Sequence, residues 1–153
     1  MSNPTRATVT IAALAGALAI AAGCGNSEQN EYVDEVNQLQ AELVNEVTDT
    51  VAEAAPSDPE AYREIAVELR RTFEAKADEF EAVDAPEDVA ALHAQLVEAI
   101  RAVGEQIGDA ERGFAGGTPR QAQRAAASLQ QAGTELQARL DAVIDQINAE
   151  LGD

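Results

Sequence analysis

Residues 31–54 read EYVDEVNQLQAELVNEVTDTVAEA, and the apolar side chains of this stretch recur every three or four positions. That spacing places them on one face of an α-helix, whereas a half-buried strand would alternate with a period of two. The apolar stripe consists of Tyr32, Val33, Val36, Leu39, Leu43, Val47, Val51 and Ala54. No later stretch alternates with a period of two either, so the sequence predicts an all-α fold.

Further helices are predicted from start signals that combine a proline with a capping residue. Pro59, Pro86 and Pro119 each follow a Ser, Asp or Thr by one or two positions, and a Glu or Gln comes soon after. Such side chains cap helix N-termini, and proline fits the first turn because its missing N–H has no helical partner there. Gly113, Gly116 and Gly117 are typical of a helix end. The predicted helices cover about 31–54, 59–83, 86–112 and 119–151.

Amphipathic helices of this length, joined by short loops, predict an antiparallel up-down four-helix bundle for residues 31–153. In that topology the end of the first helix lies beside the start of the fourth. Asp49 and Glu53 would then face Arg120 and Arg124. The acids lie at the negative end of their helix dipole and the arginines at the positive end of theirs, so each side would offset the unfavourable charge of the other.

The first 23 residues differ from the rest of the chain. They contain one basic residue, Arg6, and no acid, and 7–22 are almost entirely apolar. This run is shorter than the ~18–20 apolar residues that cross a bilayer comfortably, and it fits the apolar region of a secretory signal. We therefore expect 1–23 to be a cleaved leader, followed by a short polar tether over 24–30.

Cys24 is the only cysteine, and it stands where the apolar leader meets the polar tether. The stretch Ala21-Ala22-Gly23-Cys24 resembles the lipobox of bacterial prolipoproteins, although Leu is commoner in that family at the position of Ala21. The resemblance implies a diacylglycerol on the Cys24 sulfur and cleavage just before it. A protein so modified is attached to the cell membrane through its lipid, on the extracytoplasmic side. The alternatives are an ordinary secretory signal with an incidental thiol, and an uncleaved single-span anchor.

Charge narrows the range of partners. The whole chain has 10 basic and 28 acidic residues, and removal of the leader takes away one base and no acid, which leaves a net charge of −19. Nucleic acid binding requires a basic surface and is excluded. The same charge disfavours adhesion of the folded body to an anionic membrane.

The predicted first helix carries an acidic face, which we define as Glu35, Glu42, Glu46, Asp49 and Glu53. These residues are spaced by seven, four, three and four positions, so they share one side of the helix. The face is a candidate contact surface for a cationic protein partner, or a weak cation site. The alternative is a solvated face without a ligand, and no loop with calcium-ligand spacing occurs.

Candidates for chemistry are few. His93, the only histidine, flanks the stripe of the third helix. A ferritin-like metal site would need Glu-x-x-His, but position 90 is Ala, and an imelysin-like His-x-x-Glu would need an acid in place of Leu96. We therefore predict a boundary histidine, no metal site and no catalytic residue. Lys76, the only lysine, is predicted to extend its amine from the stripe's edge into water.

Composition and leader together resemble the small, uncharacterised helical lipoproteins of alanine-rich bacterial proteomes. The resemblance implies no cofactor apart from the covalent lipid at Cys24. The first hypothesis for function is a non-enzymatic interaction or scaffold module anchored in the membrane. The alternative is a ligand- or cation-binding bundle that acts as a sensor or carrier, and an enzyme is the remote third reading.

Overall fold

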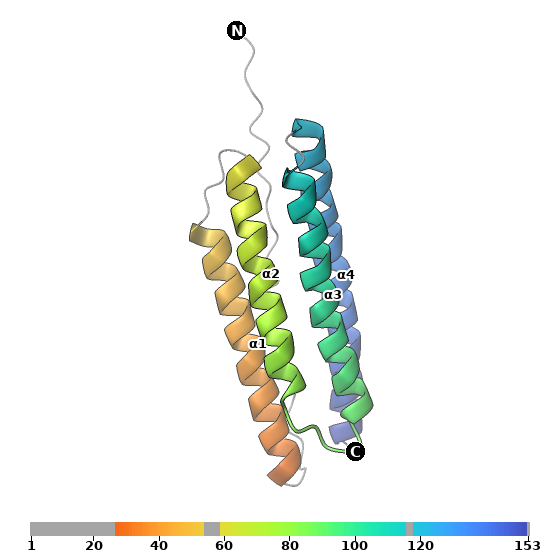
Figure 1. The fold of residues 1–153 in the computed structure, drawn as a ribbon. Helices are drawn as coiled ribbons and strands as arrows, with labels where there is room; N and C mark the ends of the chain where they lie inside the picture. Colours follow the sequence, from red (N-terminus) through yellow and green to blue (C-terminus); the bar gives the residue numbers. More distant parts are fainter. Residues whose placement is uncertain (1–26, 54–58, 116–117, 153) are drawn as a thin grey trace.

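The computed structural model describes residues 27–53, 59–115 and 118–152, and all regular structure in these ranges is helical (Figure 1). The predicted leader and Cys24 lie outside the described residues. Helices adjacent in the chain pack on one another, with α2 on α3 and α3 on α4 in the most extensive contact and α1 on α2 in a lighter one. The helices are α1 (Ser27–Glu53), α2 (Pro59–Glu81), α3 (Ala90–Ala115) and α4 (Pro119–Gly152).

The core is formed by buried apolar side chains from every helix of the described residues. The largest fully buried side chains are Tyr32, Phe80, Leu96, Ile100, Ile144, Ile147, Val36 and Val89. Along α1 the burial is uneven, because Leu39, Leu43 and Val51 are only partly buried against this core. The apolar stripe of α1 is therefore covered at its N-terminal end and less completely beyond it.

The first helix begins at Ser27, four residues before the predicted start, so 27–30 form its first turn and not a tether. Glu28 lies in this turn, where a negative charge interacts favourably with the positive end of the helix dipole. Tyr32 and Val33 follow at once and are 1% and 2% exposed. Their burial fixes the start of the helix and so supports the turn before it.

The connection from α2 to α3 also departs from the sequence prediction. α2 ends at Glu81, and α3 begins only at Ala90, because Pro86 opens a turn and not the helix itself. The Val89 N–H donates to the Pro86 carbonyl at 3.0 Å, and the His93 N–H then donates to the Val89 carbonyl at 2.8 Å. Proline has pre-set a turn that leads into the helix, and the buried Val89 secures it.

The start of α4 agrees with the predicted capping box. The Gln121 N–H donates to Thr118 Oγ1 at 3.3 Å, and the Thr118 hydroxyl donates in turn to Gln121 Oε1. Before this cap, α3 runs three residues past the predicted end at Arg112. Phe114 lies in that extra turn, is buried, and stacks on Tyr62 of α2 with ring centroids 5.7 Å apart.

The predicted contact between the end of the first helix and the start of the fourth is wrong for Asp49. α1 and α4 are not among the helix pairs in extensive contact, and Figure 1 shows α1 beside α2 and α4 behind α3. No ion pair joins Asp49 to Arg120 or Arg124 in the described part of the chain, and the Glu53 side chain lies outside it. The prediction failed because it assumed that an up-down order also brings α1 against α4, whereas helices in that order can pack mainly on their neighbours in the chain.

Two glycines of α3 lie at helix contacts of different tightness. A Cβ at Gly113 would lie 2.9 Å from the Ala125 Cβ of α4, which is closer than two non-bonded carbon atoms approach each other. A Cβ at Gly104 would lie 3.6 Å from the Phe73 Cβ of α2, an ordinary contact distance. Gly113 therefore sets the distance between α3 and α4, whereas a methyl group fits at Gly104.

We expect Gly113→Ala to lower the free energy of unfolding by about 1–3 kcal/mol, because the new methyl group forces α3 and α4 apart. Gly104→Ala is the matched control and should be neutral or stabilising by up to about 1 kcal/mol, since alanine is the better helix former. Urea unfolding followed by circular dichroism measures both. Equal effects of the two substitutions would contradict the close contact at Gly113.

Candidate functional site

Four members of the predicted acidic face are described, and they differ in what they contact. Glu35 and Asp49 are exposed. Glu42 and Glu46 form salt bridges, because each has one carboxylate oxygen within 3.2 Å of the Lys76 ammonium. The acidic face is therefore divided into an outward part and a part that pairs with α2, which the spacing along the sequence could not reveal.

Lys76 is the centre of this pairing, and the prediction that its amine reaches water is wrong. Its side chain is only 6% exposed, and Nζ lies 3.0 Å from Glu42, 3.2 Å from Glu46 and 2.8 Å from Glu79. Glu42 and Glu46 belong to α1, and Glu79 follows Lys76 by three residues on α2. All three hydrogens of the ammonium thus have a carboxylate partner.

Burial favours the neutral amine, but the hydrogen bonds to Glu79, Glu42 and Glu46 outweigh it and raise the pKa of Lys76 above its usual value. The lysine therefore remains charged throughout the neutral range. Its contribution to stability is complete below the pKa of an ordinary lysine and is lost only as strongly alkaline pH removes the proton.

Glu42 is held in the charged form from two sides. The Gln38 amide donates to its Oε1 at 3.0 Å, and Lys76 donates to its Oε2. The bond from Gln38 and then that from Lys76 lower the pKa of Glu42. The carboxylate therefore stays ionised at neutral and mildly acidic pH.

We expect Lys76→Met to lower the free energy of unfolding by about 1–2 kcal/mol at low salt, because three carboxylates lose their shared counter-charge. The loss should shrink in 1 M salt, where the screening length falls to about 3 Å. Arg71→Met is the control: Arg71 is exposed and pairs loosely with Glu68, so its removal should change stability by less than about 0.5 kcal/mol. A loss that is the same at both salt concentrations would contradict the electrostatic role of Lys76.

A second buried polar group joins α1 to α3. The Tyr32 hydroxyl lies 3.1 Å from His93 Nδ1, and His93 Nε2 lies 2.8 Å from the backbone carbonyl of Phe80 on α2. The two rings meet edge to face with centroids 5.5 Å apart. His93 is 6% exposed, so the prediction of a boundary histidine is wrong.

The partners of His93 fix its tautomer. A carbonyl oxygen only accepts, so Nε2 carries the proton and donates to Phe80. Nδ1 is then the acceptor for the hydroxyl proton of Tyr32. Both ring nitrogens and the hydroxyl are satisfied, and this holds only for the neutral imidazole.

Burial shifts both groups toward their neutral forms. It lowers the pKa of His93, against smaller opposing effects of the Phe80 carbonyl and the Glu35 charge. It raises the pKa of Tyr32 to about 12. At pH 7 the pair is therefore a neutral phenol that donates to a neutral imidazole.

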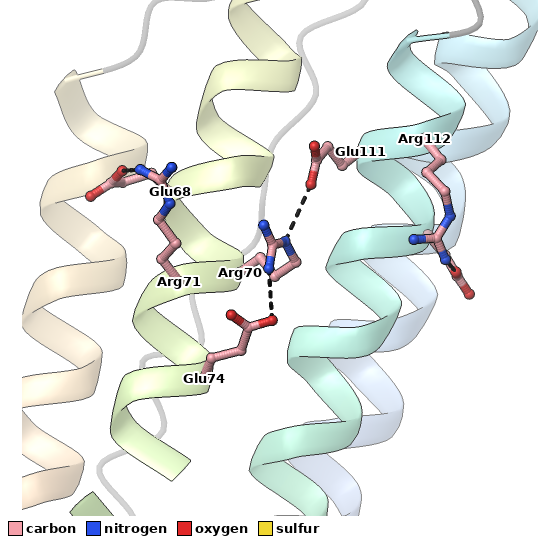
Figure 2. A network of polar contacts seen from close by, with 7 residues as sticks. Glu68, Arg70, Arg71, Glu74, Glu111 and Arg112 are labelled. Carbon is pink, nitrogen blue, oxygen red and sulfur yellow. Dashed lines mark hydrogen bonds and ion pairs between the residues drawn. The ribbon is translucent and has the colours of Figure 1, made fainter. Parts of the chain in front are cut away.

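A third polar group connects the middle of α2 with the C-terminal part of α3 (Figure 2). Arg70 of α2 contacts Glu74 at 2.8 Å and Glu111 of α3 at 3.3 Å. A Cβ at Gly108 would lie 3.1 Å from the Arg70 Cδ, so the glycine leaves room for the arginine stem. Figure 2 also shows Arg71 and Arg112 on other sides of their helices, and neither enters this bridge.

The buried polar groups on α2 and α3 thus have structural partners. Within the described residues, no group of three or more His, Cys, Asp or Glu is arranged to hold a metal ion. The sequence did contain a signal for Lys76, which stands midway between Phe73 and Phe80 in the core stripe with Glu79 one turn on. The Tyr32–His93 pair had none, since 61 residues separate its members.

None of the helices in the described residues has an apolar stretch long enough to cross a lipid bilayer. The described molecule is thus an all-helical protein whose ionisable core groups lie at helix contacts. It belongs to a family of unknown function, DUF6376, whose model matches residues 26–143. No curated protein and no solved structure matches the chain.

Proposed function

We propose that the protein is a membrane-anchored lipoprotein on the extracytoplasmic side, and that it serves as a non-enzymatic interaction or scaffold module. Its body would be a four-helix bundle of antiparallel up-down topology. The sequential packing of α1 on α2, α2 on α3 and α3 on α4 supports that topology. The lipobox-like residues ending at Cys24 support the anchor.

The start of α1 sets how the body would stand on the membrane. Ser27 is the first residue of α1, so only three residue steps separate it from Cys24. Even fully extended, that stretch spans only about 10 Å. A lipid on Cys24 would therefore keep the N-terminus of α1 close to the headgroups.

The outward part of the acidic face carries the interaction hypothesis. Asp49 is exposed, and it is not among the carboxylates bonded to Lys76 in the described residues. Lysine or arginine side chains of a partner could reach Asp49 without competing with the Lys76 ion pairs. We assign this end of α1 as the contact surface for a cationic protein partner.

The anchor is tested with Cys24→Ala, which removes the only sulfur that could carry a lipid. We expect the wild type to sediment with membranes and the variant to appear in the soluble fraction. Intact mass of the detergent-extracted wild type should equal the chain from Cys24 onward plus acyl groups. A variant that remains in the membranes would point to an uncleaved anchor and sink the lipoprotein assignment.

The contact surface is tested with Asp49→Lys/Glu53→Lys, which reverses two charges near the α1 C-terminus, where cations suit the helix dipole. Glu98→Lys/Glu105→Lys makes the same change in net charge on exposed positions of α3. After extraction in mild detergent, native mass spectrometry should show a co-purifying protein with the wild type and the α3 variant, and at least about tenfold less with the α1 variant. Equal capture by both variants would remove the acidic face from the proposal.

A further inference from the structure

α1 is the least firmly packed of the four helices. Its contact with α2 is the lightest between chain neighbours, and Leu39, Leu43 and Val51 stay partly exposed. Gln40 adds a cost, because its side-chain oxygen is buried without a hydrogen-bond partner in the described part of the chain. Attachment of α1 therefore depends on a few contacts.

The N-terminal end of α1 holds the most complete of these contacts. Tyr32, Val33 and Val36 are at most 2% exposed. Tyr32 makes a direct hydrogen bond from α1 to α3, to Nδ1 of His93. His93 is bonded in turn to the carbonyl of Phe80 on α2, so one imidazole joins three helices.

Protonation of that imidazole would break the arrangement. Nδ1 would become a donor and would meet the hydroxyl that now donates to it. The Tyr32 hydroxyl is buried, and no other hydrogen-bond partner for it is found in the described residues. Protonation would thus bury a charge and leave a phenol proton unpaired, and both costs end if α1 moves away and admits water.

We propose that the Tyr32–His93 pair is a pH-sensitive latch, which holds the N-terminal part of α1 on α2 and α3 at neutral pH and releases it when His93 is protonated in mildly acidic surroundings. The latch is independent of the proposed anchor and contact surface, because it uses neither Cys24 nor the Asp49 end of α1.

The groups around His93 decide whether the pKa of its imidazole is raised or lowered. From α1 come the Tyr32 hydroxyl and the Glu35 carboxylate, and from α2 comes the uncharged Phe80 carbonyl. α4 contributes none of the groups that act on His93 in the described residues. Glu35 attracts a proton to His93, but burial has the larger effect, so the pKa of His93 stays below its usual 6.5.

The sign of the pH dependence follows. As pH falls below about 6.5, a histidine in the released or unfolded state takes up its proton before the latched one does. The latch therefore stabilises the packing of α1 on α2 and α3 fully above that pH, and this stabilisation weakens below it. Because one proton is involved, the equilibrium for release changes by at most about tenfold per pH unit.

The experiment uses the full chain in mild detergent between pH 7.5 and 5.0. His93 is the only histidine, so its ring resonance in NMR reports its protonation without ambiguity. Amide hydrogen exchange, corrected for the intrinsic effect of pH, measures the opening of 27–36 against a reference stretch, 96–107 of α3. We expect protection of 27–36 to fall by up to about tenfold per pH unit with the midpoint of the His93 titration, while the reference stays protected.

Two variants and a control sharpen the test. His93→Gln keeps a donor and an acceptor but cannot titrate in this range, so exchange of 27–36 should lose its dependence on pH. Tyr32→Phe keeps the ring and removes the hydroxyl, so opening should already be raised at pH 7.5. Tyr62→Phe changes the other tyrosine, which stacks on Phe114 away from the latch, and should behave as wild type.

Three results would overturn the latch. The first is a His93 titration at or above pH 6.5 in the full chain. The second is opening of 27–36 with a midpoint different from that titration, which the wild type alone can show even if a variant fails to fold. The third is an unchanged pH dependence in His93→Gln.

Discussion

The packing of α2 against α3 is the constraint on which the rest of the structure depends. Phe73 and Phe80 from α2 and Leu96 and Ile100 from α3 are all buried. Each such side chain contributes about 1.5–3 kcal/mol through removal from water. α4 packs on α3 and α1 packs on α2, and the contact of α1 is the lighter of the two. The two outer helices are thus unequal, and α1 depends more on polar contacts.

Those polar contacts respond to pH in opposite directions. The pKa of Lys76 is raised, so its ion pairs with α1 are complete at neutral pH and are lost toward alkaline pH. The pKa of His93 is lowered by burial, so its bond with Tyr32 is complete at neutral pH and is lost toward acid. Both contacts attach α1 to its neighbours. α1 is therefore held most firmly at neutral pH, between the acidic range in which His93 is protonated and the alkaline range in which Lys76 loses its proton.

The sequence was sufficient to predict which segments are helical and which face of each helix is apolar. Apolar spacing and the proline start signals predicted the helices that the described residues form, and the Thr118 cap was confirmed. Helix ends were less predictable, because tertiary burial moved them: Tyr32 and Val33 extend α1 backward, and Phe114 extends α3 past Gly113. Periodicity shows which face of a helix is buried but not against which neighbour.

The same limit explains the errors at the candidate site. Seen in one helix, Lys76 lies between two phenylalanines and His93 lies beside Leu92, and each was assigned to a boundary because no partner was visible. The partners came from α1, which supplies Glu42 and Glu46 to the lysine and Tyr32 to the histidine. A buried ionisable group can be predicted only together with the group that satisfies it, and here the two are 30 to 61 residues apart.

Because the latch lies near the predicted lipid anchor, its response to pH would change how the helical body is held to the membrane. If Cys24 carries a lipid, Tyr32 lies eight residues from the membrane anchor, and a force on the anchor acts first on the start of α1. With the Tyr32–His93 bond intact, that force is passed to α3 and so to the whole body. With His93 protonated, it acts on a helix with partly exposed Leu39 and Leu43, which can separate before α2 and α3 do. The same chain would then stand either close to the membrane or at the end of a longer tether, and one proton on one imidazole would shift the balance between the two.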